Sequence, residues 1–267
     1  MRIKKVHEDI GEYNNESSFL AVVASIAPHI RNKTLMQAGK PTIPDINTFE
    51  SSPLETNAFY LNSKNTIALN MGITQIPLFE YKFPPAAKYG FIGAVIGHEL
   101  THGFDASGVY YDLYGRYNQW VGDEAFKKFK NETQCLIDQY SNFCFTGHKD
   151  ACVNGDRTLS ENIADLGGLL ASYKAWSTLP DDVKDKDYKP KGLEHYTWNQ
   201  IFFLVFGNTW CTKISEEDMN YFRFSSNRHS PGPSRVNGTL QNMYQFADAF
   251  NCPLGSRMNP MNKCKVW

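Results

Sequence analysis

A proline-free apolar run that carries two histidines constrains this chain more than any other feature of its sequence. Pro84 and Pro85 stand just before the run, and proline suits the first turn of a helix because its missing N–H would have no partner there. The run then extends from Ala86 to Gly103 without another proline. It predicts a buried helix. Such a helix must provide partners for its histidines and its glutamate, because unpaired polar groups are costly to bury.

The histidines belong to the segment His98-Glu99-Leu100-Thr101-His102, which matches the H-E-x-x-H pattern of zinc sites. Residues four apart lie on one face of a helix, so both imidazoles can reach a single tetrahedral zinc ion. Glu99 is offset by one position and can accept a proton from water beside the metal. The alternative is a chance match, in which the histidines are ordinary core or surface residues.

A catalytic zinc site needs a third protein ligand, and the segment Glu161-Asn162-Ile163-Ala164-Asp165 is the best candidate. Glu161 and Asp165 are four residues apart and face the same way, so one can bind the metal while the other hydrogen-bonds a histidine ligand. The alternative is a capped helix start. Thr158 followed by Glu161 fits a capping box, with acidic residues near the positive end of the helix dipole.

The remaining patterns predict a mainly helical α+β protein. Alternating apolar residues predict extended structure over 58–69, and a second short extended segment is expected within 108–118. A loop is expected over 143–156 and a charged linker over 181–191. Besides the run described above, helices are expected over 1–35, 123–140, 158–176, 194–211 and 240–250.

Charge and hydropathy exclude several classes of protein. The 267 residues carry a formal net charge of −1, and no run of Lys or Arg stands out. This argues against a nucleic-acid partner or a membrane-surface partner, since both depend on clustered basic charge. No membrane segment is expected, because no apolar stretch is long enough. The basic start at Met1 is not followed by the apolar region of a signal peptide.

The six cysteines leave the redox compartment open. None forms a C-x-x-C pair, which argues against a zinc ribbon or a thioredoxin-like motif. They can be reduced, buried thiols, or they can form disulfides in an oxidising compartment. Glycosylation sequons are compatible with secretion, although such short patterns also arise by chance. They begin at Asn15, Asn32, Asn131 and Asn237.

Several segments, taken together, resemble a known family. They are Asn57-Ala58-Phe59-Tyr60, the run from Gly97 to Asp105, Glu161-Asn162-Ile163-Ala164-Asp165, His229-Ser230-Pro231 and the terminal Cys264-Lys265-Val266-Trp267. They follow one another in the family's order, from about residue 55 to the last residue. The chain resembles the neprilysin/endothelin-converting-enzyme family of zinc endopeptidases, of the gluzincin type.

The resemblance implies a thermolysin-like catalytic domain, with a small sheet and an active-site helix, over residues 56–267. It implies one zinc ion as cofactor, and short peptides cleaved on the amino side of hydrophobic residues. The implied ligands are His98, His102 and Glu161, with Glu99 as the general base that activates the attacking water.

The resemblance also gives roles to residues around the metal. Asp165 is expected to orient a histidine ligand, most naturally His98, and Asp105 is a weaker candidate for the same role at His102. His229 is expected to stabilise the oxyanion of the tetrahedral intermediate. The implied substrate-binding residues are Arg235 for a backbone carbonyl, Asn57 and Ala58 for the substrate main chain, and Phe79, Val95 and Trp210 near the hydrophobic pocket.

The chain also departs from the family, whose members usually have a cytoplasmic tail, one membrane helix and a helical second lobe. Residues 1–55 are therefore expected to be a residual helical segment and loop of that lobe, and the chain a fragment, an incomplete gene model or a truncated paralogue. The family implies an extracellular or cell-surface location.

The family implies a disulfide between Cys135 and Cys264, whereas Cys144 and Cys152 are paired only because they are close in sequence. The partners that the family gives to Cys211 and Cys252 are missing. These two cysteines are therefore either orphaned or paired with each other.

Three functional hypotheses follow. The first is an active zinc endopeptidase that acts on short peptides. The second is a truncated chain that binds zinc or peptides without cleaving them. The third is an unrelated helical scaffold with a chance H-E-x-x-H. Zinc content separates the third from the others, and turnover separates the first from the second.

Overall fold

The computed structural model describes residues 18–36, 38, 51–145, 148–184, 189–213, 215 and 227–266. The chain divides into two units, Met1–Ser52 and Pro53–Trp267. Helix α2, Phe19–Met36, is the described element of the first unit. The rest of the helix expected over 1–35, and most of the loop expected after it within residues 1–55, lie outside the described residues. Within the described ranges, no helix has the length and apolar character needed to span a membrane.

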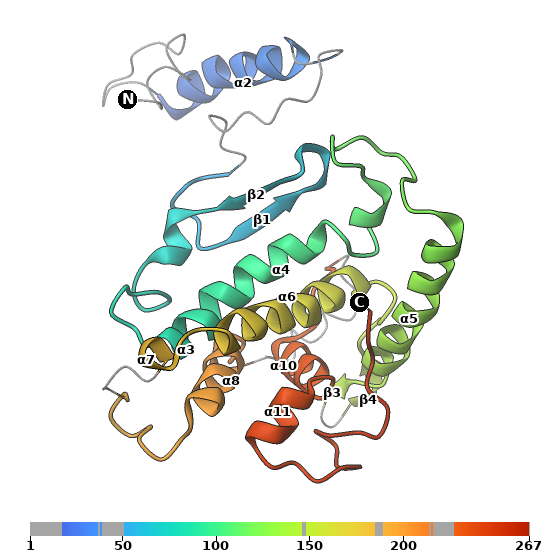
Figure 1. Ribbon diagram of the computed structural model, residues 1–267. Helices are drawn as coiled ribbons and strands as arrows, with labels where there is room; N and C mark the ends of the chain where they lie inside the picture. The colour runs from blue at the N-terminus through green and yellow to red at the C-terminus, as the bar shows by residue number, and fades with distance from the viewer. Residues whose placement is uncertain are drawn as a thin grey trace. The chain divides into compact units, whose positions relative to one another are not determined.

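The second unit is mainly helical, with two small antiparallel sheets (Figure 1). Its strands are β1 (Ala58–Leu61), β2 (Thr66–Leu69), β3 (Cys144–Phe145) and β4 (His148–Cys152). Its helices are α3 (Pro85–Lys88), α4 (Ala94–His102), α5 (Asp123–Ser141), α6 (Leu159–Ser177), α7 (Asp181–Lys184), α8 (Trp198–Thr209), α10 (Gly232–Leu240) and α11 (Tyr244–Ala249).

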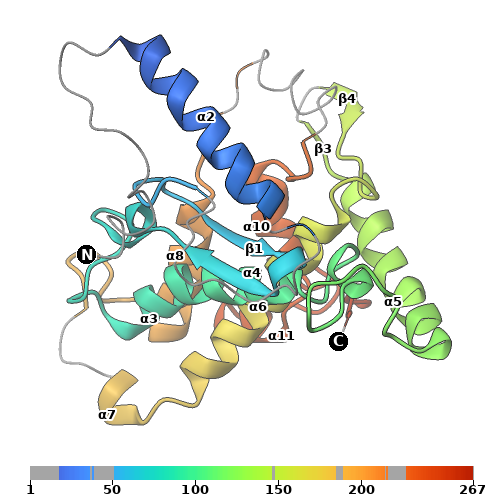
Figure 2. The same cartoon turned by 90° about the horizontal axis from the view of Figure 1, so that it is seen from above.

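The β1–β2 hairpin forms the extended segment expected over 58–69. Ala58 pairs with Leu69 and Leu61 with Thr66, and Asn65 closes the turn in the left-handed region, with φ at 46°. The hairpin lies along α4, and α6 lies on the opposite side of α4 (Figures 1 and 2). The hairpin and α6 therefore enclose the helix that carries both histidines.

The apolar run is helical, as predicted, from Pro85 to His102. A π-helical turn over 89–93 joins α3 to α4. α4 crosses α6 in close contact because both helices have a glycine at the crossing: a Cβ on Gly97 would lie 2.5 Å from the carbonyl oxygen of Gly168. This contact places the first turn of α6 beside the histidines of α4.

An aromatic core fixes the other face of α6. Its largest side chains are at most 2% exposed: Trp176 on α6, and Phe202 and Phe203 on α8. The side chain of Thr197 and that of Gln200 form a capping box at the start of α8, which stabilises the first turn of that helix. A disulfide between Cys135 and Cys264 attaches the end of the chain to α5.

Some local expectations were wrong. The loop expected over 143–156 contains the β3–β4 hairpin, which the Cys144–Cys152 disulfide bridges. The segment 108–118 forms a single bridge between Tyr111 and Tyr117 instead of a strand. The linker expected over 181–191 begins with helix α7, and the helix expected over 240–250 is the shorter α11.

Helix α10 was not expected, because Gly232, Pro233 and Gly238 disfavour a helix in isolation. It begins after Pro231, with proline in its first turn. Its residues Arg235, Thr239 and Leu240 are buried. Tertiary packing therefore outweighs weak helix propensity here.

Candidate active site

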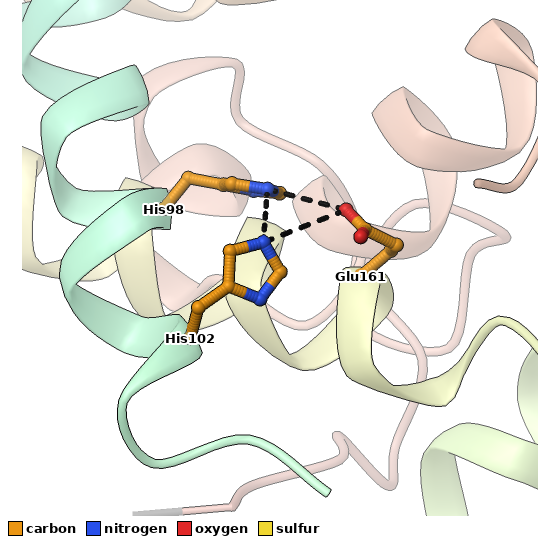
Figure 3. Close-up of side chains that lie close together, drawn as sticks. All are labelled: His98, His102 and Glu161. Atoms are coloured by element: carbon orange, nitrogen blue, oxygen red, sulfur yellow. Dashed lines mark hydrogen bonds and ion pairs between the residues drawn. The ribbon is translucent and has the colours of Figure 1, made fainter. Parts of the chain in front are cut away.

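Three side chains from α4 and α6 meet at one point, as Figure 3 shows. His98 Nε2 and His102 Nε2 lie 3.0 Å apart. Glu161 Oε2 lies 3.2 Å from the first and 3.7 Å from the second. Glu161 is in the first turn of α6, but the capping box expected there does not form: Thr158 Oγ1 donates to the Asn154 carbonyl and accepts from Asn162. The Glu161 carboxylate turns toward the histidines instead.

Each histidine also contacts a carboxylate through its other ring nitrogen. His98 Nδ1 lies 2.9 Å from Asp165 Oδ1, and His102 Nδ1 lies 2.7 Å from Asp105 Oδ2. An ionised carboxylate can only accept, so each Nδ1 carries the proton and donates it. In the neutral imidazoles, both Nε2 atoms therefore direct lone pairs into the same space.

This donor set fits a zinc ion. Two lone pairs 3.0 Å apart repel each other unless a cation or a proton lies between them. Glu161 Oε2 is buried and has no hydrogen bond of good geometry with the described residues. Among those residues, His98, His102 and Glu161 are the group with metal-binding spacing. Two imidazoles and one carboxylate are a known ligand set for catalytic zinc.

The ionisation of the site shows how strongly it attracts positive charge. Burial alone would lower the pKa of His98, but the Asp165 and Glu161 carboxylates outweigh burial and raise this pKa to about 9. Burial would raise the pKa of Glu161, but the contact with His98 and the charges of the other histidines lower it to about 2. The carboxylate therefore stays ionised at neutral pH.

Glu99 lies in the same cavity and is 6% exposed. Burial raises the pKa of its carboxyl group, and the positive charges of His98 and His102 partly offset this rise. A carboxylate with a raised pKa is a stronger base than a carboxylate in water. Glu99 can therefore accept a proton from a group close to His98 and His102.

Asp165 is held by a second buried charge. Arg235 donates from Nε to Asp165 Oδ2 and from Nη2 to Asp165 Oδ1, both at 2.6 Å. Burial opposes ionisation of Asp165, but Arg235 and His98 hold the pKa of this carboxyl well below its usual range. The ring of Trp210 lies 3.6 Å from the guanidinium carbon of Arg235. The Asp165–Arg235 ion pair was missed in the sequence, where 70 residues separate its partners.

A cavity of about 520 Å³ adjoins His98, His102 and Glu161. Besides the residues above, its lining includes the expected substrate residues Asn57, Ala58, Val95, Trp210 and Arg235. Phe79 is not in the lining, and its neighbour Leu78 is. Two further aromatic residues, Phe91 and Phe206, also line the cavity. They lie within apolar helices that gave no sign of a site.

His229 reaches the cavity from the segment before α10. Its Nε2 lies 3.3 Å from Glu161 Oε2, and its Nδ1 lies 3.1 Å from Asn227 Oδ1. The same Asn227 oxygen accepts the backbone N–H of His229. Both ring nitrogens therefore face acceptors, an arrangement that suits an imidazolium, although burial lowers the pKa of His229.

Comparison with known families shows to which family this chain belongs. The family model described as "Peptidase family M13" matches residues 57–266. The chain belongs to peptidase family M13. The match covers all the residues that form the cavity except Thr56. It also agrees with the family resemblance of the motifs.

Curated relatives of this M13 chain include neprilysin-3 of Drosophila melanogaster, which is 40% identical over 216 residues. That match covers 81% of this chain and 27% of the relative. Human endothelin-converting enzyme 1 is 39% identical over 230 residues, which cover 84% of this chain and 28% of that protein. The chain thus spans less than a third of the length of these relatives.

Solved structures confirm the expected fold, a mainly helical α+β domain of the thermolysin-like type. The Mycobacterium tuberculosis zinc metalloprotease Zmp1, in complex with an inhibitor, matches with a TM-score of 0.78 and 28% identity, over 93% of this chain and 37% of that one. A Haemonchus galactose-containing glycoprotein complex matches with a TM-score of 0.77 and 36% identity, over 96% and 42%.

Proposed function

We propose that this M13 chain is the catalytic part of a zinc endopeptidase that cleaves short peptides on the amino side of hydrophobic residues. One observation carries the proposal: His98, His102 and Glu161 converge in a cavity that also holds the buried Glu99. Membership of a peptidase family supports the reaction class. In this proposal residues 56–267 form the catalytic domain, and residues 1–55 derive from the second lobe.

One zinc ion would be held by His98, His102 and Glu161. When bound, zinc supplies a Lewis acid that polarises the substrate carbonyl and favours loss of a proton from water. Glu99 accepts that proton and passes it to the leaving amine, and its raised pKa favours the first transfer. His229, with a proton on Nε2, donates to the developing oxyanion.

The substrate main chain would lie along β1. Asn57 and Ala58 line the cavity at the start of this strand, and strand addition at an exposed edge is a common mode of peptide binding. Arg235 uses two of its five N–H donors on Asp165, so others remain for a substrate carbonyl. Phe91, Val95 and Phe206 offer an apolar surface to the hydrophobic residue after the cleaved bond.

Cleavage of a quenched fluorescent peptide with a central Phe or Leu tests the proposal. The protein is produced in an oxidising host, because the structure contains two disulfides. These disulfides also support an extracellular or cell-surface location. We expect turnover that a chelator abolishes. Glu99→Gln should lower kcat/KM by about 10²–10⁴, the usual contribution of a general base, while zinc content stays unchanged.

The alternative is a chain that binds zinc and peptides without cleaving them. Cys211 and Cys252 favour it, because the family gives each of them a disulfide partner that this sequence does not supply. The structure leaves both as free thiols, which rules out the arrangement in which they pair with each other. A folded, zinc-loaded protein that binds the peptide but shows no turnover would establish this alternative. Full activity of the Glu99→Gln variant would instead show that another group is the base.

A further inference from the structure

The cavity has two chemically different ends. The end beside the N-terminal half of α4 is apolar, with Phe91 and Val95 in its lining. Helix α8, which contributes Phe206, packs here, because Gly90 lies against the backbone of Phe202. The other end lies beyond His102, the last residue of α4. Its lining contains the polar residues Tyr60, Asp105, Ser107 and Ser160.

Two serine hydroxyls meet at the polar end. Ser107 Oγ and Ser160 Oγ are 3.3 Å apart, which is longer than the 2.7–2.8 Å usual for a hydrogen bond between hydroxyls. This weak contact is easily replaced. Each hydroxyl can donate one hydrogen bond and accept two, so the pair can bind a polar group that enters between or beside them.

The backbones of both serines are fixed relative to the metal ligands. Asp105 accepts the backbone N–H of Ser107 with Oδ1, at 2.7 Å, while its Oδ2 contacts His102. Ser160 directly precedes Glu161 in the first turn of α6. The two hydroxyls are thus held at a defined distance from the candidate metal centre. Fixed backbones with weakly bonded side chains are what a preorganised subsite requires.

Tyr60 forms a further wall of this end. Its hydroxyl donates to Asn65 Oδ1 at 2.6 Å, and the backbone of Gly103, just after α4, approaches its ring so closely that a Cβ on Gly103 would lie 2.9 Å from the Tyr60 oxygen. The Tyr60 hydroxyl is therefore committed to Asn65. The serine pair still offers both donors and acceptors to a ligand.

We propose that Ser107 and Ser160 form a polar subsite that binds a hydroxyl or amide side chain, such as Thr, Ser or Asn, on the amino side of the cleaved bond. This inference rests on the proposed function. If the hydrophobic residue after the bond occupies the apolar end, the residues before the bond extend toward the polar end. A hydroxyl or amide there replaces the weak serine contact with hydrogen bonds of ordinary length, and an apolar side chain cannot.

Two pairs of matched peptides test the subsite. Within each pair the peptides differ only in Thr or Val, which have nearly the same shape, at the first or the second residue before the bond. We expect kcat/KM to favour Thr about threefold to tenfold at one of these positions, as one net hydrogen bond between neutral groups would give. The Ser107→Ala/Ser160→Ala double variant should bring that ratio close to one.

Ser177→Ala is the matched control, because Ser177 lies on the same helix as Ser160, is exposed, and its hydroxyl donates to the nearby Lys174 carbonyl. It should keep the wild-type ratio. If the double variant fails to fold, the single variants Ser107→Ala and Ser160→Ala are measured, and each should reduce the ratio. A ratio near one in the wild-type protein, or an unchanged ratio in the variants, would overturn the subsite while leaving the peptidase proposal intact.

Peptide binding to the Glu99→Gln protein separates the two proposals. If no peptide is cleaved in a chelator-sensitive manner, the proposed function fails, but the affinities of the Thr and Val peptides still report on the subsite. Tighter binding of the Thr peptide, lost in the serine variants, supports it. Equal affinities for the two peptides overturn it.

Discussion

The two histidines of the candidate centre are oriented in different ways. His102 contacts Asp105, which is three residues further along the chain. His98 contacts Asp165, which is 67 residues away on another helix and is itself bound by Arg235. The support of His102 is therefore local. The support of His98 is a buried network that forms only when α4, α6 and α10 pack together.

This difference indicates that the buried charges beside His98 stabilise the fold as well as the site, whereas the charge beside His102 mainly supports the site. Asp105 is buried, but two backbone N–H groups, those of Ser107 and Gly108, donate to its other oxygen. Asp165 is buried against Arg235, which is 6% exposed. A buried ion pair is costly to break on one side only, because the remaining charge loses its partner. We therefore expect the His98 side to be the more sensitive of the two.

The largest effect should come from Arg235→Ala, which removes the partner of Asp165. We expect it to lower the free energy of unfolding by about 3–5 kcal/mol, the usual cost of breaking a buried pair. Urea unfolding followed by circular dichroism measures this change. The matched control is Arg116→Ala: Arg116 bonds Asp112 in a similar manner at 2.7–2.8 Å, but on the surface. Equal losses in the two variants would contradict the comparison.

The pH dependence of the free energy of unfolding should distinguish the support of His98 from that of His102 in chelator-treated protein. The pKa of His98 rises from 6.5 to about 9 in the folded state. Its contribution to stability is therefore fully present below pH 6.5 and is lost as the pH rises toward 9. We expect a loss of about 2–3 kcal/mol across this window, measured by urea unfolding at pH 6, 7.5 and 9. Asp165→Asn should remove most of the dependence, because Asp165 contributes most to the raised pKa of His98, and Asp105→Asn should leave it. An identical slope in both variants would show that His98 is not the titrating group.

The smallest effect concerns metal affinity. Asp105→Asn and Asp165→Asn each alter a carboxylate that contacts a histidine of the candidate centre. If that centre binds zinc, changes of this kind usually cost about 10–100-fold in affinity. We expect the greater loss for Asp165→Asn, because Arg235 then faces a neutral partner and is free to move. Competition with a chromophoric chelator gives both zinc affinities. A greater loss for Asp105→Asn would reverse the order proposed for the two supports.

The H-E-x-x-H helix shows how much of the secondary structure local sequence patterns can predict. The helix from Pro85 to His102, the extended character of residues 58–69 and α5 were predicted from residue patterns, since each depends on periodicity within one segment. The turn that makes 58–69 a hairpin was not predicted. Short and poorly helical elements were not predicted either. The β3–β4 hairpin has too few residues to show a period, and α10 contains two glycines and a proline. Their formation depends on packing against the rest of the domain.

The residues of the candidate site also divide into those that local spacing predicts and those that it does not. His98, Glu99 and His102 follow from spacing on one helix, whereas the role of Glu161 depended on the family resemblance, because periodicity alone also allowed a helix cap. By itself, the sequence determined the helix that carries the H-E-x-x-H motif, and the family. Only the tertiary structure decided that the Glu161 carboxylate turns from the cap toward the histidines, that Arg235 pairs with Asp165, and that Ser107 meets Ser160. Such contacts join residues that are 50 to 70 positions apart in the sequence. No local pattern encodes them, because they depend on the glycine crossing of α4 and α6 and on the burial of α10.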